Sequence, residues 1–112
     1  MRVLSVFTRN VSDVKPPSQE DMDRMGELIA EMRGKGVLVD TGGRMPDMLE
    51  FTVARKNGEV NVIDGPYAES KEVVGGYALL EVAGREDAIA WSKRFLDLVG
   101  DASCHLHEVS CG

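Results

Sequence analysis

The sequence has few cysteines, few aromatic residues and no long hydrophobic run. Its two cysteines, Cys104 and Cys111, stand close to the C-terminus, and in a chain without an export signal this favours free thiols over a disulfide framework. No stretch approaches the roughly 20 apolar residues that a membrane span needs, and the opening segment is too short and interrupted for a signal peptide. We therefore expect a cytoplasmic protein with no membrane partner.

Clustered positive charge is also missing from the chain. The 13 Lys and Arg residues stand against 19 Asp and Glu residues, which gives a formal net charge of −6. Nucleic-acid binding needs a concentrated positive surface that displaces counterions from phosphates. We therefore expect no nucleic-acid partner, and the same deficit argues against anionic membrane surfaces.

The chain does have the composition of one ordinary globular domain. It contains 112 residues, of which 43% are hydrophobic and 29% are charged. This length lies within the usual range of a single domain and is sufficient to bury a core. We expect one domain over residues 1–112, with no internal repeat.

Hydrophobic periodicity and turn residues divide the chain into strands and helices. A first helix is expected after the N-cap Ser18, with Asp21 three residues on, and it ends at Gly34. Its apolar positions are Met22, Met25, Leu28, Ile29 and Met32. A second helix is expected over 85–99, with Ala88, Trp91, Phe95 and Leu98 on one stripe. Strands are expected over 2–8, 37–41, 49–56, 59–63, 77–82 and 104–109.

Two turn signals separate the strands in the middle of the chain. Asn57-Gly58 predicts a hairpin between strands 49–56 and 59–63, because both central positions of a type I′ turn need a positive φ. Gly42-Gly43 predicts a loop with unusual backbone angles. The element order is therefore β-α-β, a hairpin, then β-α-β.

This order predicts an α+β fold, a ferredoxin-like sandwich with an antiparallel sheet. Right-handed crossovers place both helices on one face of that sheet and leave the other face bare. Strands 2–8 and 77–82 carry apolar residues at both odd and even positions, so apolar side chains point to both faces of the sheet. A sheet with one face in water would expose too many of them. A second copy of the chain is the simplest cover, so we expect a homodimer that forms a dimeric α+β barrel.

The stretch from Asp64 to Val82, DGPYAESKEVVGGYALLEV, resembles the signature of the YCII-related family. In that family an Asp-Gly-Pro-Phe core leads into Gly-Gly and a strand, and Tyr67 stands where Phe is usual. The similarity extends over nearly the whole chain. It implies a fold similar to muconolactone isomerases and antibiotic monooxygenases, which are dimeric α+β barrels with a pocket between sheet and helices. Most members have no assigned reaction, and one branch includes a dehydrochlorinase of chlorinated hydroquinones.

The candidate catalytic residues are Asp64 and Lys71. Asp64 precedes the turn-forming Gly65-Pro66, so its carboxylate can act as a general base at the sheet edge or accept the loop's own N–H groups in an Asx turn. Lys71 can pair with Asp64 or hold an anionic group, or belong to a solvated charge run. The other candidate binding residues are Arg44, Tyr67, Glu69, Glu72, Gly75, Gly76 and Tyr77.

Each of these binding candidates also has a structural interpretation. Gly75 and Gly76 can serve backbone geometry or close strand approach, and Tyr67 and Tyr77 can lie in the core or in a dimer interface. Asp40 and Arg44 flank Gly42-Gly43 and can reach the same pocket or form a surface pair.

The only histidines, His105 and His107, share one face of the last predicted strand. With Cys111 nearby a metal site is conceivable, but the spacing matches no metal-binding pattern, so we expect no metal and no cofactor. The resemblance implies a His-Asp pair in some family members. In this sequence no histidine lies in the first helix or in the strand after it.

Two functional hypotheses follow from these residues and from the resemblance. In the first, the 64–77 loop covers a pocket that binds a small organic molecule, with cofactor-free proton transfer or elimination by Asp64 as base and Lys71 as its electrostatic partner. In the second, the protein is a non-catalytic binding or regulatory module, because family members often occur beside alternative sigma factors. The sequence leaves open whether the protein is an enzyme.

Overall fold

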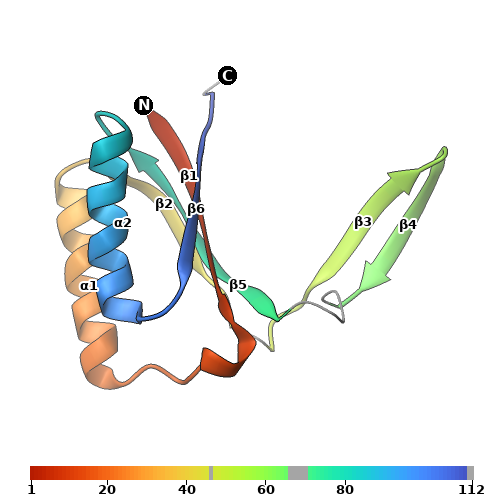
Figure 1. Cartoon of the computed structure of the whole chain (residues 1–112), viewed down its shortest axis with the longest axis horizontal. Coiled ribbons are helices and arrows are strands. Elements are labelled where there is room, and N and C mark those ends of the chain that lie inside the picture. The colour runs from red at the N-terminus through yellow and green to blue at the C-terminus, as the bar shows by residue number, and fades with distance from the viewer. Residues whose placement is uncertain (46, 66–70, 111–112) are drawn as a thin grey trace.

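In the computed structural model the described residues are 1–45, 47–65 and 71–110 (Figure 1). The predicted order of β-α-β, hairpin and β-α-β is confirmed. The elements are β1 (Arg2–Asn10), the short 3-10 helix η1 (Val11–Asp13), α1 (Gln19–Gly34), β2 (Leu38–Gly43), β3 (Phe51–Lys56), β4 (Glu59–Asp64), β5 (Glu72–Glu81), α2 (Arg85–Val99) and β6 (Ser103–Glu108).

Four strands form an antiparallel sheet in the order β2-β5-β1-β6. Both helices cover one face of this sheet, as predicted (Figure 1). β1 and β2 belong to one β-α-β unit and β5 lies between them, which is the split arrangement of a ferredoxin-like fold. The fold class predicted from the sequence is therefore confirmed.

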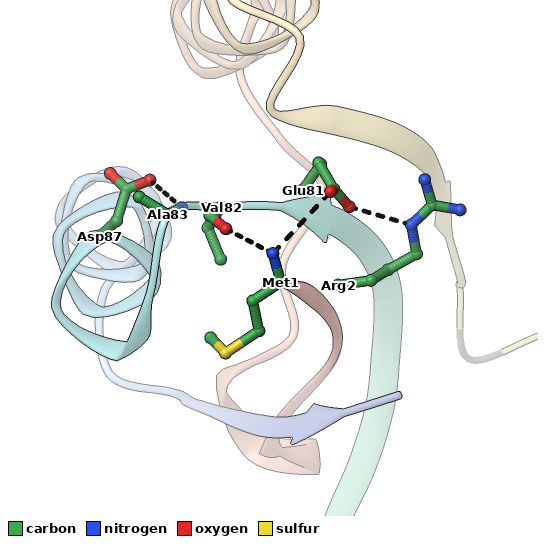
Figure 2. A network of polar contacts seen from close by, with 6 residues as sticks. All are labelled: Met1, Arg2, Glu81, Val82, Ala83 and Asp87. Carbon is green, nitrogen blue, oxygen red and sulfur yellow. Dashed lines mark hydrogen bonds and ion pairs between the residues drawn. The ribbon is translucent and has the colours of Figure 1, made fainter. Parts of the chain in front are cut away.

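The two helices begin at local signals in the sequence. Ser18 accepts a hydrogen bond from the Asp21 N–H, and Asp21 accepts one from the Ser18 N–H, so the capping box forms at α1. At α2 the N-cap is Gly84, which has no side chain. The carboxylate of Asp87 accepts a hydrogen bond from the Ala83 N–H at 3.1 Å instead (Figure 2).

The core lies between the helices and the sheet, and it contains the predicted helix stripes in large part. Met22 and Met25 are the exceptions, since Met22 is about half exposed and Met25 is not part of the core cluster. The buried apolar residues among those described are Val3, Leu28, Met32, Val37, Leu38, Leu80, Val82, Ala88 and Trp91. Neither helix in the described part of the chain has the length and hydrophobicity that crossing a membrane would require.

Contacts at the start of β1 join it to the end of β5 (Figure 2). The Met1 amino group donates to the Val82 carbonyl oxygen at 2.9 Å and lies 3.8 Å from the Glu81 carboxylate. Arg2 forms an ion pair with the same carboxylate at 3.1 Å. These groups are partly exposed, so the ion pairs fix the position of the strand ends more than they stabilise the fold.

β1 and β4 run slightly beyond their predicted ends, and the corrections to β2 and β5 involve glycine. Gly42-Gly43 is not a loop but the end of β2, paired with Tyr77 and Gly76, and neither residue has a positive φ. β5 begins at Glu72 rather than at Tyr77. Residues 64–77 are therefore not one loop, because cross-strand pairing extends β5 back through both glycines.

The hairpin of β3 and β4 projects from the rest of the fold, and we call residues 51–64 the arm. The predicted turn is confirmed, since Asn57 and Gly58 have φ values of 53° and 81°. The arm strands pair only with each other among the described strands. The radius of gyration is 15.8 Å, whereas a compact domain of this length has about 13 Å, so the arm extends the molecule.

Candidate functional site

A cavity of about 330 Å³ lies between the sheet and the two helices. Its walls are mostly apolar. Leu28 and Met32 line it from α1, Trp91 and Phe95 from α2, and Phe7 from β1. Phe7 and Phe95 meet edge to face, with ring centroids 5.0 Å apart. Closely packed aromatic walls of this kind form a shaped pocket for a small apolar group.

Apart from the indole of Trp91, the residues that line the cavity offer hydroxyls and a thiol as hydrogen-bonding side chains. Thr41 donates to the Tyr77 carbonyl oxygen and Ser92 to the Ala88 carbonyl oxygen, both at 2.8 Å, so these two protons are already used. Ser5 and Cys104 line the cavity together at the β1–β6 side. None of the described residues that line the cavity carries a charge.

The thiol of Cys104 is half-buried and its pKa is raised. Burial is the main cause, because an apolar environment disfavours the thiolate, and the hydrogen bond with Ser5 opposes it in part. The thiol therefore stays protonated and keeps its hydrogen at neutral pH. Ser5 and Cys104 together give the mostly apolar cavity a polar spot that a bound molecule can contact.

Glycines of β2 and β5 form one edge of the cavity. Gly42, Gly43, Gly75 and Gly76 all border it, together with Tyr77. A Cβ atom at Gly75 would lie 2.5 Å from the Phe7 ring, so the ring occupies the space that a side chain would take. The absence of a side chain at Gly75 leaves room for the Phe7 ring in the cavity wall.

Tyr77 is tied to the edge strand β2. Its ring lies against Gly42, and its hydroxyl donates to the Asp40 carboxylate at 2.9 Å. This hydrogen bond and the charge of Asp40 raise the pKa of Tyr77, with a further contribution from burial. Tyr77 pairs with Val6 in register, so its side chain belongs to the sheet face that the helices leave open.

The two candidate catalytic residues lie away from the cavity. Asp64 is exposed at the end of β4, where it pairs with Phe51 of β3. Lys71 is also exposed, and its carbonyl oxygen accepts a hydrogen bond from the Val11 N–H at 2.8 Å. Neither borders the cavity in one copy of the chain. Their acid–base role stays a prediction.

Of the other candidate binding residues that the structure describes, only Gly75, Gly76 and Tyr77 border the cavity. Glu72 is exposed at the start of β5, and Tyr67 and Glu69 lie outside the described residues. The structure therefore groups the second half of the sequence signature at the cavity edge and leaves Asp64 on the arm.

Arg44 supports the base of the arm. Its guanidinium forms an ion pair with Glu50 at 2.8 Å. Its backbone N–H donates a hydrogen bond to the Gly75 carbonyl oxygen at 2.9 Å. Asp40 bonds to Tyr77 instead, so the two residues that flank the glycines have separate partners. Arg44 thus orients the chain where it leaves β2 for the arm.

The two histidines lie on one face of β6, as predicted, and both are exposed. His105 shares a hydrogen bond with the Thr8 hydroxyl at 3.1 Å, and His107 pairs in register with Leu4. Among the described residues, no three side chains of the His, Cys, Asp and Glu types lie close enough together to hold a metal ion.

A second, more open groove runs beside η1 and the start of α1. Arg9 borders it, donates to the Val99 carbonyl oxygen at 3.1 Å and lies 5.1 Å from the centre of the Phe7 ring. Its Nε atom is buried with no hydrogen-bond partner. Side chains of both signs, including Lys15 and Asp101, line this groove, so we assign it no ligand.

Sequence reasoning did not identify Ser5 and Cys104 as site residues. A signal for Ser5 was present, because strand alternation places it on the same face as Val3 and Phe7. A hydroxyl on the buried face of a strand needs a partner and marks a position worth examining. Cys104 had no comparable signal, since its neighbour across the sheet is set by the tertiary fold.

Comparison with known proteins agrees with this architecture. The YCII-related domain model matches residues 1–95, which include every element from β1 to the greater part of α2. No curated protein matches the sequence. β6 lies beyond the matched range, yet it completes the sheet beside β1. Because the match covers far more than half of the chain, this protein belongs to the YCII-related domain family.

Proposed function

We propose that this protein binds a small, largely apolar and uncharged organic molecule in the cavity between the sheet and the helices. The single observation that carries this proposal is the cavity itself. Its volume of about 330 Å³ lies within the range of small-molecule sites, and no charged side chain lines it in the described part of the chain. Transfer of an ionised ligand into such a site would be costly without a countercharge.

The polar groups of the wall support a ligand with one or two hydrogen-bonding atoms. Ser5 and Cys104 lie on neighbouring strands and face the cavity together. A ligand hydroxyl or carbonyl placed at this pair would leave its apolar part against Phe7, Phe95 and Trp91. Specificity then comes from the shape of the aromatic wall and from this one polar contact.

Proton transfer or elimination by Asp64, with Lys71 as electrostatic partner, remains the chemical extension of this proposal. A general base must come within hydrogen-bond reach of the proton that it removes. In one copy of the chain both residues are exposed and outside the cavity wall. Binding without turnover, as in an accessory or sensing protein, is therefore the simpler form of the function.

We also propose that the protein is a homodimer joined through the open face of the sheet. Leu4 and Val6 of β1 and Leu79 of β5 lie on that face, opposite the buried Val3, Ser5 and Leu80, and remain only half-buried. Apolar side chains in the middle of an open sheet face favour a second layer. A two-fold related copy supplies that layer.

The binding proposal is tested with N-phenyl-1-naphthylamine, a neutral probe that fluoresces in apolar sites, followed by a thermal-shift screen of neutral aromatic compounds. Ser92 and Lys93 are neighbours on α2, but Ser92 lines the cavity and Lys93 is exposed. We expect Ser92→Leu to fill the cavity and reduce probe affinity by about tenfold or more, and Lys93→Leu to leave it unchanged. Equal affinity in both variants would refute the proposal.

The chemical extension is tested on any compound that this screen identifies. If Asp64 is the base, Asp64→Asn should retain affinity for the compound and lose its turnover. If the side chain only caps its turn, the same substitution should lower the melting temperature by a few degrees, as the loss of about 1 kcal/mol does. Wild-type protein that binds the compound without converting it supports the non-catalytic form.

A further inference from the structure

The arm has one mainly apolar face, which we call its apolar face, and one mainly polar face. Strand register places Arg55 and Asp64 on one face of the arm together with four apolar side chains, which are Phe51, Val60 and the cross-strand pair Val53 and Val62. All four side chains are more than half exposed, from 52% for Phe51 to 63% for Val62. The pairs on the opposite face are Thr52 with Ile63, Ala54 with Asn61 and Lys56 with Glu59. Strands with this alternation are typical of a sheet that is covered on one side.

Nothing in the described part of the chain covers the apolar face of the arm. A two-stranded hairpin is at best marginally stable in water by itself, and its exposed apolar side chains make that worse. The arm extends from the sheet on the side opposite the helices (Figure 1). It therefore lies on the same side as the open sheet face.

The exposed area of the chain is large for a folded monomer. It is 8007 Å², whereas a monomer of this size exposes about 6,100 Å², so the chain exposes about 1,900 Å² more than expected. A stable interface of ordinary size covers roughly 800 Å² on each partner. The sheet face and the arm together supply an area of the size that an obligate dimer covers.

We propose that the apolar face of the arm packs against a second copy of this chain, so that each subunit of the proposed homodimer holds the other with its arm. When a two-fold axis relates two subunits, each contact between a surface of the first and a surface of the second occurs twice, once from each subunit. Two unpartnered apolar surfaces on one side of the same chain, one flat and one projecting, fit that requirement. The inference rests on the proposed homodimer and adds the arm to its interface.

The same packing would give Asp64 a new environment. Asp64 pairs with Phe51 and so lies on the apolar face of the arm. In the dimer its carboxylate faces the second subunit rather than the cavity of its own subunit. The acidic residue of the sequence signature thereby becomes an interface residue.

Two double variants of equal charge test the arm. Val53→Lys with Val62→Lys places two lysines opposite each other on the apolar face, and Ala54→Lys with Asn61→Lys places them on the polar face one residue away. Sedimentation velocity gives the dimer dissociation constant of each. We expect the first variant to raise it by at least about 100-fold, because each subunit loses two buried valines, and the second to change it by less than about threefold.

The outcomes separate this inference from the proposed dimer and from ligand binding. A monomeric wild type overturns both the dimer and the arm contact. A dimeric wild type with equal dissociation constants for the two variants overturns the arm contact alone. Binding of N-phenyl-1-naphthylamine is measured independently on each species. If the lysine variant does not fold by circular dichroism, Val53→Ser with Val62→Ser replaces it, with the same expected direction.

Discussion

Gly76 passes so close to Gly42 that a Cβ atom at position 76 would lie 2.5 Å from the Gly42 carbonyl oxygen. This contact joins the second half of the sequence signature to the edge strand β2. Gly76 also lies next to the bulge of β5, between the pairs with Phe7 and Thr8. Glycine at this position is therefore a requirement of the sheet that borders the cavity.

Gly76→Ala should destabilise the protein by about 1–3 kcal/mol. The new methyl group would meet the Gly42 carbonyl oxygen, and the φ of 156° at this residue disfavours a side chain. Gly43→Ala is the matched control on the paired strand, because a Cβ there has no neighbour within 4 Å. Urea unfolding should place the control within about 0.5 kcal/mol of the wild type. A Gly76→Ala protein as stable as this control would contradict the packing argument.

The ion pair of Glu31 with Arg94 should stabilise the contact between α1 and α2 in a pH-dependent way. The hydrogen bonds from Arg94 lower the pKa of Glu31 to about 2, against the opposing effect of burial and with further help from Lys35. A lowered pKa means that the folded state favours the carboxylate. This stabilisation is complete above the ordinary value of 4.5 and disappears as the pH falls toward 2.

Arg94→Gln tests this ion pair by thermal unfolding across that pH range. The difference in melting temperature from the wild type should be largest at neutral pH and should shrink from pH 4.5 toward pH 2. Arg94 also lies over the Trp91 ring, and loss of that contact gives a part that does not vary with pH. Lys93→Gln removes the same charge from an exposed position as the control. A difference that stays constant with pH would refute the assignment.

The hydrogen bond from Tyr77 to Asp40 should be visible in the ionisation of the phenol. Asp40 raises the pKa of Tyr77 above its usual 10.0, because its carboxylate accepts a hydrogen bond from the neutral phenol and repels the phenolate. In a Tyr67→Phe background the phenolate absorbance reports Tyr77 alone, since the chain has two tyrosines. Asp40→Asn should move the midpoint down toward 10.0, and Asp47→Asn should not. An unchanged midpoint in the Asp40 variant would show that the bond does not persist in solution.

Cys104 should react slowly with alkylating agents, because only the thiolate is nucleophilic. In a Cys111→Ser background, the dependence of the iodoacetamide rate on pH gives the pKa of Cys104, which we expect above the usual 9.0. Ser5→Ala removes the hydrogen bond that lowers this pKa, so the midpoint should rise further. A midpoint below 9.0, or one that falls in the Ser5 variant, would contradict the cavity environment described for this thiol.

Several features of the fold could be predicted because they depend on neighbouring residues in the chain. α2 runs from Arg85 to Val99 with Gly100 after it, as the apolar stripe and the glycine indicated. Ser18 and Asp21 form the cap that their spacing predicted. The turn at Asn57-Gly58 follows in the same way, because backbone angles and caps are settled within a few residues.

The tertiary structure alone decided where β2 and β5 end and which residues line the cavity. The sequence predicted a loop at Gly42-Gly43, but pairing with β5 places both glycines in the sheet. Asp64 was the strongest site candidate by its motif, yet the arm carries it away from the cavity that the last residues of the same signature border. Ser5 and Cys104, which are far apart in sequence, meet there instead. Local sequence determines turns and helix ends, whereas strand limits and cavity walls depend on partners that only the folded chain brings together.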